Sequence, residues 1–126
     1  DQSYMVIDYK TGLTSINTCL DIRPSEPQLA LYSIAIENVQ AAAFAQIKVD
    51  RLIYNGISQD ELSIKGIKPI EHISWSEQLD LWHNELSQLA DEFSSGYAHI
   101  QPRNYLSCAY CDLHSLCRRF EWEQAI

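Results

Sequence analysis

The chain has 126 residues, of which 46% are hydrophobic and 21% charged, with four Gly and four Pro. This composition excludes a disordered or low-complexity segment and predicts one compact domain over residues 1–126. The net charge of −8, from nine basic and 17 acidic residues, argues against a broad basic surface for nucleic acid but leaves room for a local site.

The first residues of the chain and the lengths of its apolar runs bear on its cellular location. No apolar run approaches the roughly 20 residues that span a bilayer, and the first residues lack the features of a signal peptide. We therefore expect a soluble, cytoplasmic protein with no membrane partner. The first residue is Asp1 rather than Met, and an apolar stretch begins at Tyr4. We therefore expect a piece of a longer chain that opens inside a domain.

Residues 4–10 form the first predicted element. Their aromatic and β-branched side chains, followed by Thr11 and Gly12, predict a strand closed by a turn. A period of two puts Asp8 and Lys10 on one face, roughly 6.5 to 7 Å apart. Such a carboxylate could hold a divalent cation, and the lysine could stabilise charge on a phosphoryl group. A salt-bridged pair at an exposed strand end has the same sequence, so this pattern alone does not establish a function.

A helix is predicted to begin at Pro27, a residue that suits a first helical position, and to run about three turns to near Asn38. Gln28 and Tyr32 are four residues apart and therefore share a face of this helix. Both side chains can hydrogen-bond phosphates or bases. An exposed polar residue beside a rim aromatic is the plainer interpretation of the same spacing.

The next predicted elements are a strand over residues 42–54, ending at Asn55 and Gly56, and a polar stretch of loop with some strand up to Pro69. A long amphipathic helix follows over residues 75–95, with a capping box at Ser74 and Glu77 and a stop at Gly96. Trp75 and Trp82 are expected to lie in the core. The apolar side chains of the helix recur at three- and four-residue steps: Trp75, Leu79, Trp82, Leu86, Leu89 and Phe93.

Three cysteines, Cys108, Cys111 and Cys117, lie within ten residues. In a chain without a secretory signal, such a cluster predicts metal or redox chemistry before a disulfide framework. Zinc and iron–sulfur sites need four ligands, so His114, Cys19 or a residue outside this chain would complete the set. Coincidental buried cysteines or an adventitious disulfide are the structural alternative. Cys19 by itself is typical of a small buried residue.

Three motifs in order connect these elements to a known family: Asp8-Tyr9-Lys10-Thr11-Gly12, then Gln28 with Tyr32, then the cysteine triplet. The chain from Tyr4 to about Glu121 resembles the RecB-like branch of the PD-(D/E)xK nuclease superfamily, and within it the AddB-type DNA-repair exonuclease domains. The resemblance implies an α/β, restriction-endonuclease-like mixed sheet flanked by helices, truncated at its N-terminal side, with a C-terminal Cys-rich segment. Its parts would be a strand–helix–strand core over 1–56, the long helix over 74–96 and the cysteine cluster over 105–119.

The resemblance also implies roles for individual residues. Asp8 would bind Mg²⁺ or Mn²⁺, and Lys10 would be the catalytic lysine. Gln28 and Tyr32 would position the substrate strand. The three cysteines would bind a [4Fe–4S] cluster, with the fourth ligand outside this chain. The family's other metal-binding acid and its first cluster cysteine are absent, so we expect the full-length protein to hydrolyse DNA while this chain alone neither cleaves efficiently nor holds a full cluster.

Several alternatives remain open at this level. A CRISPR-adaptation exonuclease shares the motifs and the cysteine pattern. A non-catalytic protein is the alternative from another class, either a degenerate nuclease scaffold or an interaction module stabilised by zinc on Cys108, Cys111, His114 and Cys117. For the nuclease, the resemblance implies DNA as substrate, a helicase–nuclease subunit as partner, and the bacterial cytoplasm as location.

Overall fold

A computed structural model describes residues 2–119 and 121. The chain forms two compact units, Asp1–Ala90 and Asp91–Ile126, which are described separately below. The sequence predicts a single domain over residues 1–126, of which residues 1, 120 and 122–126 lie outside the described part of the chain.

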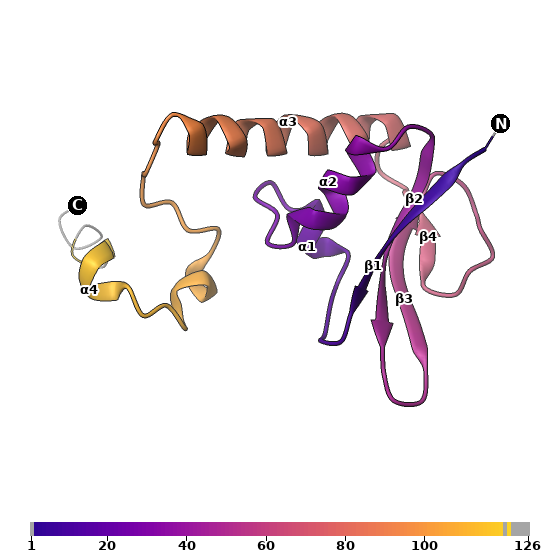
Figure 1. Ribbon diagram of the computed structural model, residues 1–126, viewed down its shortest axis with the longest axis horizontal. Coiled ribbons are helices and arrows are strands. Elements are labelled where there is room, and N and C mark those ends of the chain that lie inside the picture. The colour runs from indigo at the N-terminus through magenta and orange to yellow at the C-terminus, as the bar shows by residue number, and fades with distance from the viewer. Residues whose placement is uncertain (1, 120, 122–126) are drawn as a thin grey trace. The chain divides into compact units, whose positions relative to one another are not determined.

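The first unit is built on a four-stranded sheet (Figure 1). Its strands are β1 (Tyr4–Lys10), β2 (Val39–Ile47), β3 (Leu52–Ser58) and β4 (Ile67–Pro69), and they lie in that order. β1 pairs with β2 in parallel, β2 with β3 antiparallel, and β3 with β4 in parallel. The connection between the parallel strands β1 and β2 contains the helices α1 (Asn17–Leu20) and α2 (Pro27–Ala35). The predicted mixed sheet with flanking helices is therefore confirmed.

The core of this unit lies between one face of the sheet and the helices. Both indole rings of α3 (Trp75–Ser94) belong to it, with Trp75 only 6% and Trp82 only 2% exposed. The indole N–H of Trp75 donates to the Val39 carbonyl at 2.6 Å, and that of Trp82 to the Cys19 carbonyl at 2.8 Å. The remaining buried members come from β1, β2, β3, α1 and α2: Val6, Cys19, Leu29, Ala30, Val39, Ala42, Phe44 and Ile57.

The single strand predicted over residues 42–54, with a turn at Asn55 and Gly56, is wrong. The chain turns earlier, over residues 48–51, where the Lys48 N–H donates to the Arg51 carbonyl at 2.9 Å. Asn55 and Gly56 lie inside β3. A Cβ atom on Gly56 would lie 2.5 Å from the Ala42 carbonyl oxygen, so this glycine permits the close approach of β2 rather than a turn.

Both predicted helices are present, although their details differ from the expectation. α2 ends at Ala35, before Asn38, whose φ of 60° turns the chain into β2. α3 begins at the predicted capping box, in which the Ser74 N–H donates to Glu77 Oε2 at 2.7 Å and the Glu77 N–H to Ser74 Oγ at 3.2 Å. Trp75 and Trp82 are buried as predicted, whereas Phe93, the last side chain of the apolar stripe, is 89% exposed.

The second unit holds the last turn of α3 and two short helices, η1 (Tyr105–Cys108) and α4 (His114–Cys117). Neither short helix contains a buried residue. In the described part of the chain, no helix has both the length and the apolar character that crossing a bilayer requires.

Candidate active site

Asp8 and Lys10 lie near the C-terminal end of β1, on the face of the sheet that the helices cover. Val6 is buried in the core, and because side chains two positions apart on a strand share a face, Asp8 and Lys10 lie on the same face as Val6. Lys10 Nζ lies 3.2 Å from Asp8 Oδ2. The Asp8 side chain is 11% exposed and the Lys10 side chain 25%, so the carboxylate lies deeper and the ammonium closer to solvent.

Glu26 is a third member of this site that sequence reasoning missed. It precedes Pro27 at the start of α2, and its Oε2 lies 3.1 Å from Lys10 Nζ. The ammonium therefore contacts two carboxylates, and it also lies 5.9 Å from the centre of the Phe44 ring. The sequence does show an acidic residue directly before the proline that begins a helix. It does not show that Glu26 contacts Lys10, because only the packing of α2 against the sheet brings the two side chains together.

The two carboxylates fix the charge of Lys10. The Glu26 carboxylate first, and the Asp8 carboxylate second, raise the pKa of Lys10 above its ordinary value of 10.5. Lys10 is therefore a cation at neutral pH and cannot take a proton from water. This charge state suits a group that stabilises negative charge on a phosphoryl oxygen.

Asp8 presents a carboxylate oxygen suited to a metal ion. Its Oδ2 atom is buried and has no aligned hydrogen-bond donor among the described residues, although the Lys10 ammonium is 3.2 Å away. The Lys10 cation is thus the close partner of this buried oxygen, and carboxylate oxygens are the ligands that hard divalent cations take. Mg²⁺ is commonly held by one or two carboxylates together with water and substrate phosphate. Asp8 fits this ion, and Glu26 is the second carboxylate nearby.

Gln28 and Tyr32 share an exposed face of α2. The Gln28 side-chain amide donates to the Tyr32 hydroxyl oxygen at 2.8 Å. This leaves the Tyr32 O–H hydrogen and the Gln28 carbonyl oxygen available to another molecule. Both residues lie within two turns of Glu26 on the same helix. Their role in positioning a substrate stays a prediction.

The cysteines of the second unit are partly buried free thiols. Across residues 2–119 and 121, no three Cys, His, Asp or Glu side chains are gathered in a way that could hold a metal ion, and this includes the cysteine segment. His114 Nε2 lies 2.6 Å from the Cys108 carbonyl oxygen, and Arg119 donates to Cys108 Sγ at 3.1 Å. This arrangement does not fit a preformed cluster site, and the assignment of Cys108, Cys111 and Cys117 as [4Fe–4S] ligands stays a prediction.

Cys19 has the surroundings of a packing residue. It is fully buried, and its thiol donates to the Glu26 carbonyl at 3.1 Å. Burial raises the pKa of Cys19 to about 11. Because metal ligation needs the thiolate, this environment favours the predicted role as a small buried residue over that of a ligand.

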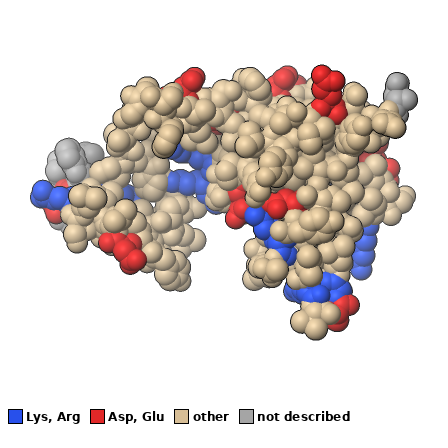
Figure 2. Space-filling view, in the orientation of Figure 1, with Lys and Arg blue, Asp and Glu red and all other residues tan. Residues whose placement is uncertain are grey.

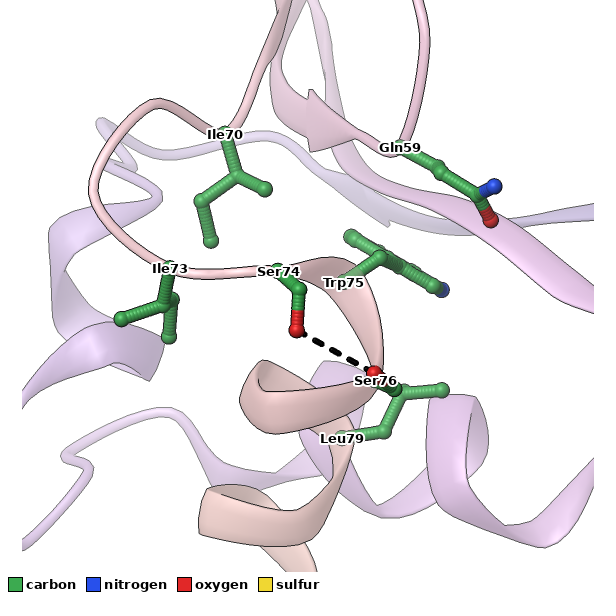
Figure 3. Close-up of a pocket in the computed structure, with 7 residues that line it drawn as sticks. All are labelled: Gln59, Ile70, Ile73, Ser74, Trp75, Ser76 and Leu79. Atoms are coloured by element: carbon green, nitrogen blue, oxygen red, sulfur yellow. Dashed lines mark hydrogen bonds between the residues drawn. The ribbon is translucent and has the colours of Figure 1, made fainter.

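A separate pocket lies at the start of α3 (Figure 3). It has a volume of about 420 Å³, and Ser74 and Ser76 meet at its edge with their hydroxyl oxygens 3.1 Å apart. Its lining contains no ionisable side chain: Gln59, Ile70, Ile73, Ser74, Trp75, Ser76 and Leu79. The pocket therefore lacks the groups that acid–base or metal chemistry requires, and the candidate site remains the one formed by Asp8, Lys10 and Glu26.

Comparison with known families agrees with this geometry. The sequence model of the PD-(D/E)XK nuclease superfamily matches residues 1–118, a span that includes β1, α2 and the cysteine segment. No curated protein and no solved structure matches the chain. The mixed sheet flanked by helices is consistent with the restriction-endonuclease-like fold of that superfamily. This chain therefore belongs to the PD-(D/E)XK nuclease superfamily.

Proposed function

We propose that this chain carries the catalytic strand of a metal-dependent DNA exonuclease that works in DNA repair or recombination. The superfamily consists mainly of nucleases, which supports the reaction class. The observation that carries the proposal is the buried Asp8 Oδ2 atom, whose one close partner among the described residues is the Lys10 ammonium at 3.2 Å. A carboxylate that can hold a divalent cation, next to a fixed positive charge, is suited to phosphodiester hydrolysis.

Asp8 would hold Mg²⁺ or Mn²⁺. When bound, such an ion polarises a phosphoryl oxygen and makes a hydroxide nucleophile accessible at neutral pH. Lys10 stays protonated and places its positive charge where the pentacoordinate phosphorus gains negative charge. Glu26 keeps the ammonium oriented from the solvent side, since its carboxylate is 42% exposed and 3.1 Å away.

The wider context of the proposal rests on the order of the motifs. A nuclease strand, a helix with Gln28 and Tyr32, and a C-terminal cysteine triplet support a helicase–nuclease type of repair protein with a partner subunit. A [4Fe–4S] cluster in the full-length gene product would be held by Cys108, Cys111 and Cys117. Iron and acid-labile sulfide measured after anaerobic purification test this assignment, and zinc found in their place would support the zinc-stabilised alternative.

The nuclease proposal is tested on the full-length gene product with labelled single-stranded and duplex DNA in Mg²⁺ and in Mn²⁺. Asp8→Asn should abolish detectable cleavage, and Lys10→Ala should lower kcat by about 10² to 10³. Asp80→Asn, on an exposed position of α3, and Lys68→Ala, on an exposed position of β4, are matched controls that should cleave as the wild type does. Cleavage unaffected by Asp8→Asn would overturn the assignment.

A second readout does not depend on cleavage. Mn²⁺ binding followed by electron paramagnetic resonance should weaken in Asp8→Asn and stay unchanged in Asp80→Asn. DNA binding without any cleavage by the wild type, in either metal, would favour the non-catalytic scaffold.

A further inference from the structure

The turn between β2 and β3 lies next to the candidate active site. Lys10, the last residue of β1, is paired with Gln46 on β2. Lys48 follows Gln46 by two residues. With strands about 4.8 Å apart and a rise of about 3.3 Å per residue, the Cα atoms of Lys10 and Lys48 are roughly 8 Å apart. The Gln46 side-chain amide also donates to the Gly12 carbonyl, which ties the loop after β1 to the same end of the sheet.

This turn carries two cations that point to a polyanionic ligand. Lys48 and Arg51 close the turn through their main-chain hydrogen bond and leave their side chains exposed. In Figure 2, blue side chains gather at the lower end of the molecule, where Figure 1 shows the turn between β2 and β3. The turn therefore places two of the chain's nine Lys and Arg residues close to the candidate active site, in a chain whose net charge is −8.

The carboxylate of Asp50, which lies in the same turn, forms only a long and exposed ion pair with Arg51. Asp50 Oδ1 lies 3.9 Å from Arg51 Nε, and the two side chains are 76% and 62% exposed. A pair this open contributes little to stability, so a phosphate can replace the carboxylate at the guanidinium at small cost. By contrast, the Lys10 ammonium is already held by two carboxylates.

Exposed apolar side chains lie beside the charged residues of the β2–β3 turn. Val49 is fully exposed at the tip, and Ile47 and Leu52 beside it are each almost half exposed. Apolar side chains flanked by basic ones are found where proteins meet both the sugar–phosphate backbone and the bases.

We propose that the β2–β3 turn is a second DNA contact, in which Lys48 and Arg51 bind phosphates next to the one held at Asp8 and Lys10, and Val49 lies against a sugar or base. The Cα atoms of Lys10 and Lys48 are roughly 8 Å apart, so their long side chains can reach neighbouring phosphates of one strand. This inference rests on the proposed nuclease function and adds where the strand runs as it leaves the site.

The test measures how DNA affinity depends on salt. The full-length gene product is titrated with a fluorescein-labelled single-stranded oligonucleotide in EDTA, which keeps the DNA intact. On single-stranded DNA, each phosphate contact contributes about 0.7 to the slope of log affinity against log salt. Lys48→Ala with Arg51→Ala should therefore reduce the slope by about 1.4. Between 50 and 200 mM salt, the wild-type affinity should fall about 7-fold more than that of the double variant.

The control is a second pair of exposed lysines in the same unit, at the far edge of the sheet. Lys65→Ala with Lys68→Ala removes the same charge and should leave the slope unchanged. Asp50→Asn should raise the affinity, because it removes the anion beside Arg51. The turn is closed by main-chain atoms, so the variants should melt as the wild type does by tryptophan fluorescence.

The outcomes separate the two proposals. If DNA cleavage depends on Asp8 but the two double variants have equal slopes, the turn is not a DNA contact and the nuclease proposal stands. If the wild type neither binds nor cleaves DNA, both proposals are overturned. A lower slope in the Lys48 and Arg51 variant alone supports the contact.

Discussion

Phe44 links the core of the first unit to its candidate active site, and its truncation gives the most quantitative prediction. The side chain is fully buried on β2, opposite Asp8, with the Lys10 ammonium 5.9 Å from its ring centre. A buried phenylalanine removes about 150 to 250 Å² from water, which at about 25 cal/mol per Å² amounts to roughly 4 to 6 kcal/mol as an upper value. Measured Phe→Ala changes in cores cost about 3 to 5 kcal/mol.

Phe44→Ala should therefore lower the free energy of unfolding by about 3 to 5 kcal/mol, a large share of the roughly 5 to 15 kcal/mol of a typical domain. Urea unfolding followed by tryptophan fluorescence suits the measurement, since Trp75 and Trp82 lie in the same core. Phe93→Ala is the matched control, because Phe93 is 89% exposed and should change stability by less than about 0.5 kcal/mol. A loss below about 1 kcal/mol in Phe44→Ala would refute the placement of this ring in the core.

Three further predictions concern the capping box and the buried thiol. Ser74→Ala removes the hydroxyl that accepts from the Glu77 N–H, and it should lower the free energy of urea unfolding by about 1 kcal/mol. Ser87→Ala, at an exposed position within α3, is the control and should be neutral or slightly stabilising. Equal effects of the two substitutions would argue against the cap. Cys19 should resist alkylation in the folded protein while Cys108, Cys111 and Cys117 react, and mass spectrometry that finds Cys19 modified as quickly as the others would contradict its burial. The pKa of Cys19 is raised from 9.0 to about 11 in the folded state, so its neutral thiol contributes stability that is present below pH 9.0 and is lost as pH rises from 9.0 to about 11. Cys19→Ala should therefore reduce the change in the urea unfolding midpoint between pH 9.0 and about 11.

The elements that sequence reasoning placed correctly are those set by neighbouring residues. β1 has the predicted bounds because its alternating apolar side chains and its Thr-Gly end are local features. α3 begins at the predicted residue because Ser74 and Glu77 satisfy each other's backbone N–H groups within one turn. Gln28 and Tyr32 meet because helical spacing alone brings side chains four residues apart together.

The features that were missed depend on partners far away in the sequence. Asn-Gly is a strong turn signal, yet Gly56 lies in β3 because β2 packs too closely there for any side chain. Glu26 joins the site because α2 packs against the sheet beside Lys10. Phe93 continues the apolar stripe of α3, yet its side chain is 89% exposed, because periodicity gives the face of a helix and not how far along the helix its packing partners extend.

The sequence by itself determined the strand that carries Asp8 and Lys10, the two main helices and the family, because these features are each encoded by residues close together in the chain. Only the tertiary structure decided which groups surround Lys10 and where the basic turn of the β2–β3 hairpin lies. These depend on strand register and helix packing, which join residues up to tens of positions apart and are set by burial rather than by local pattern.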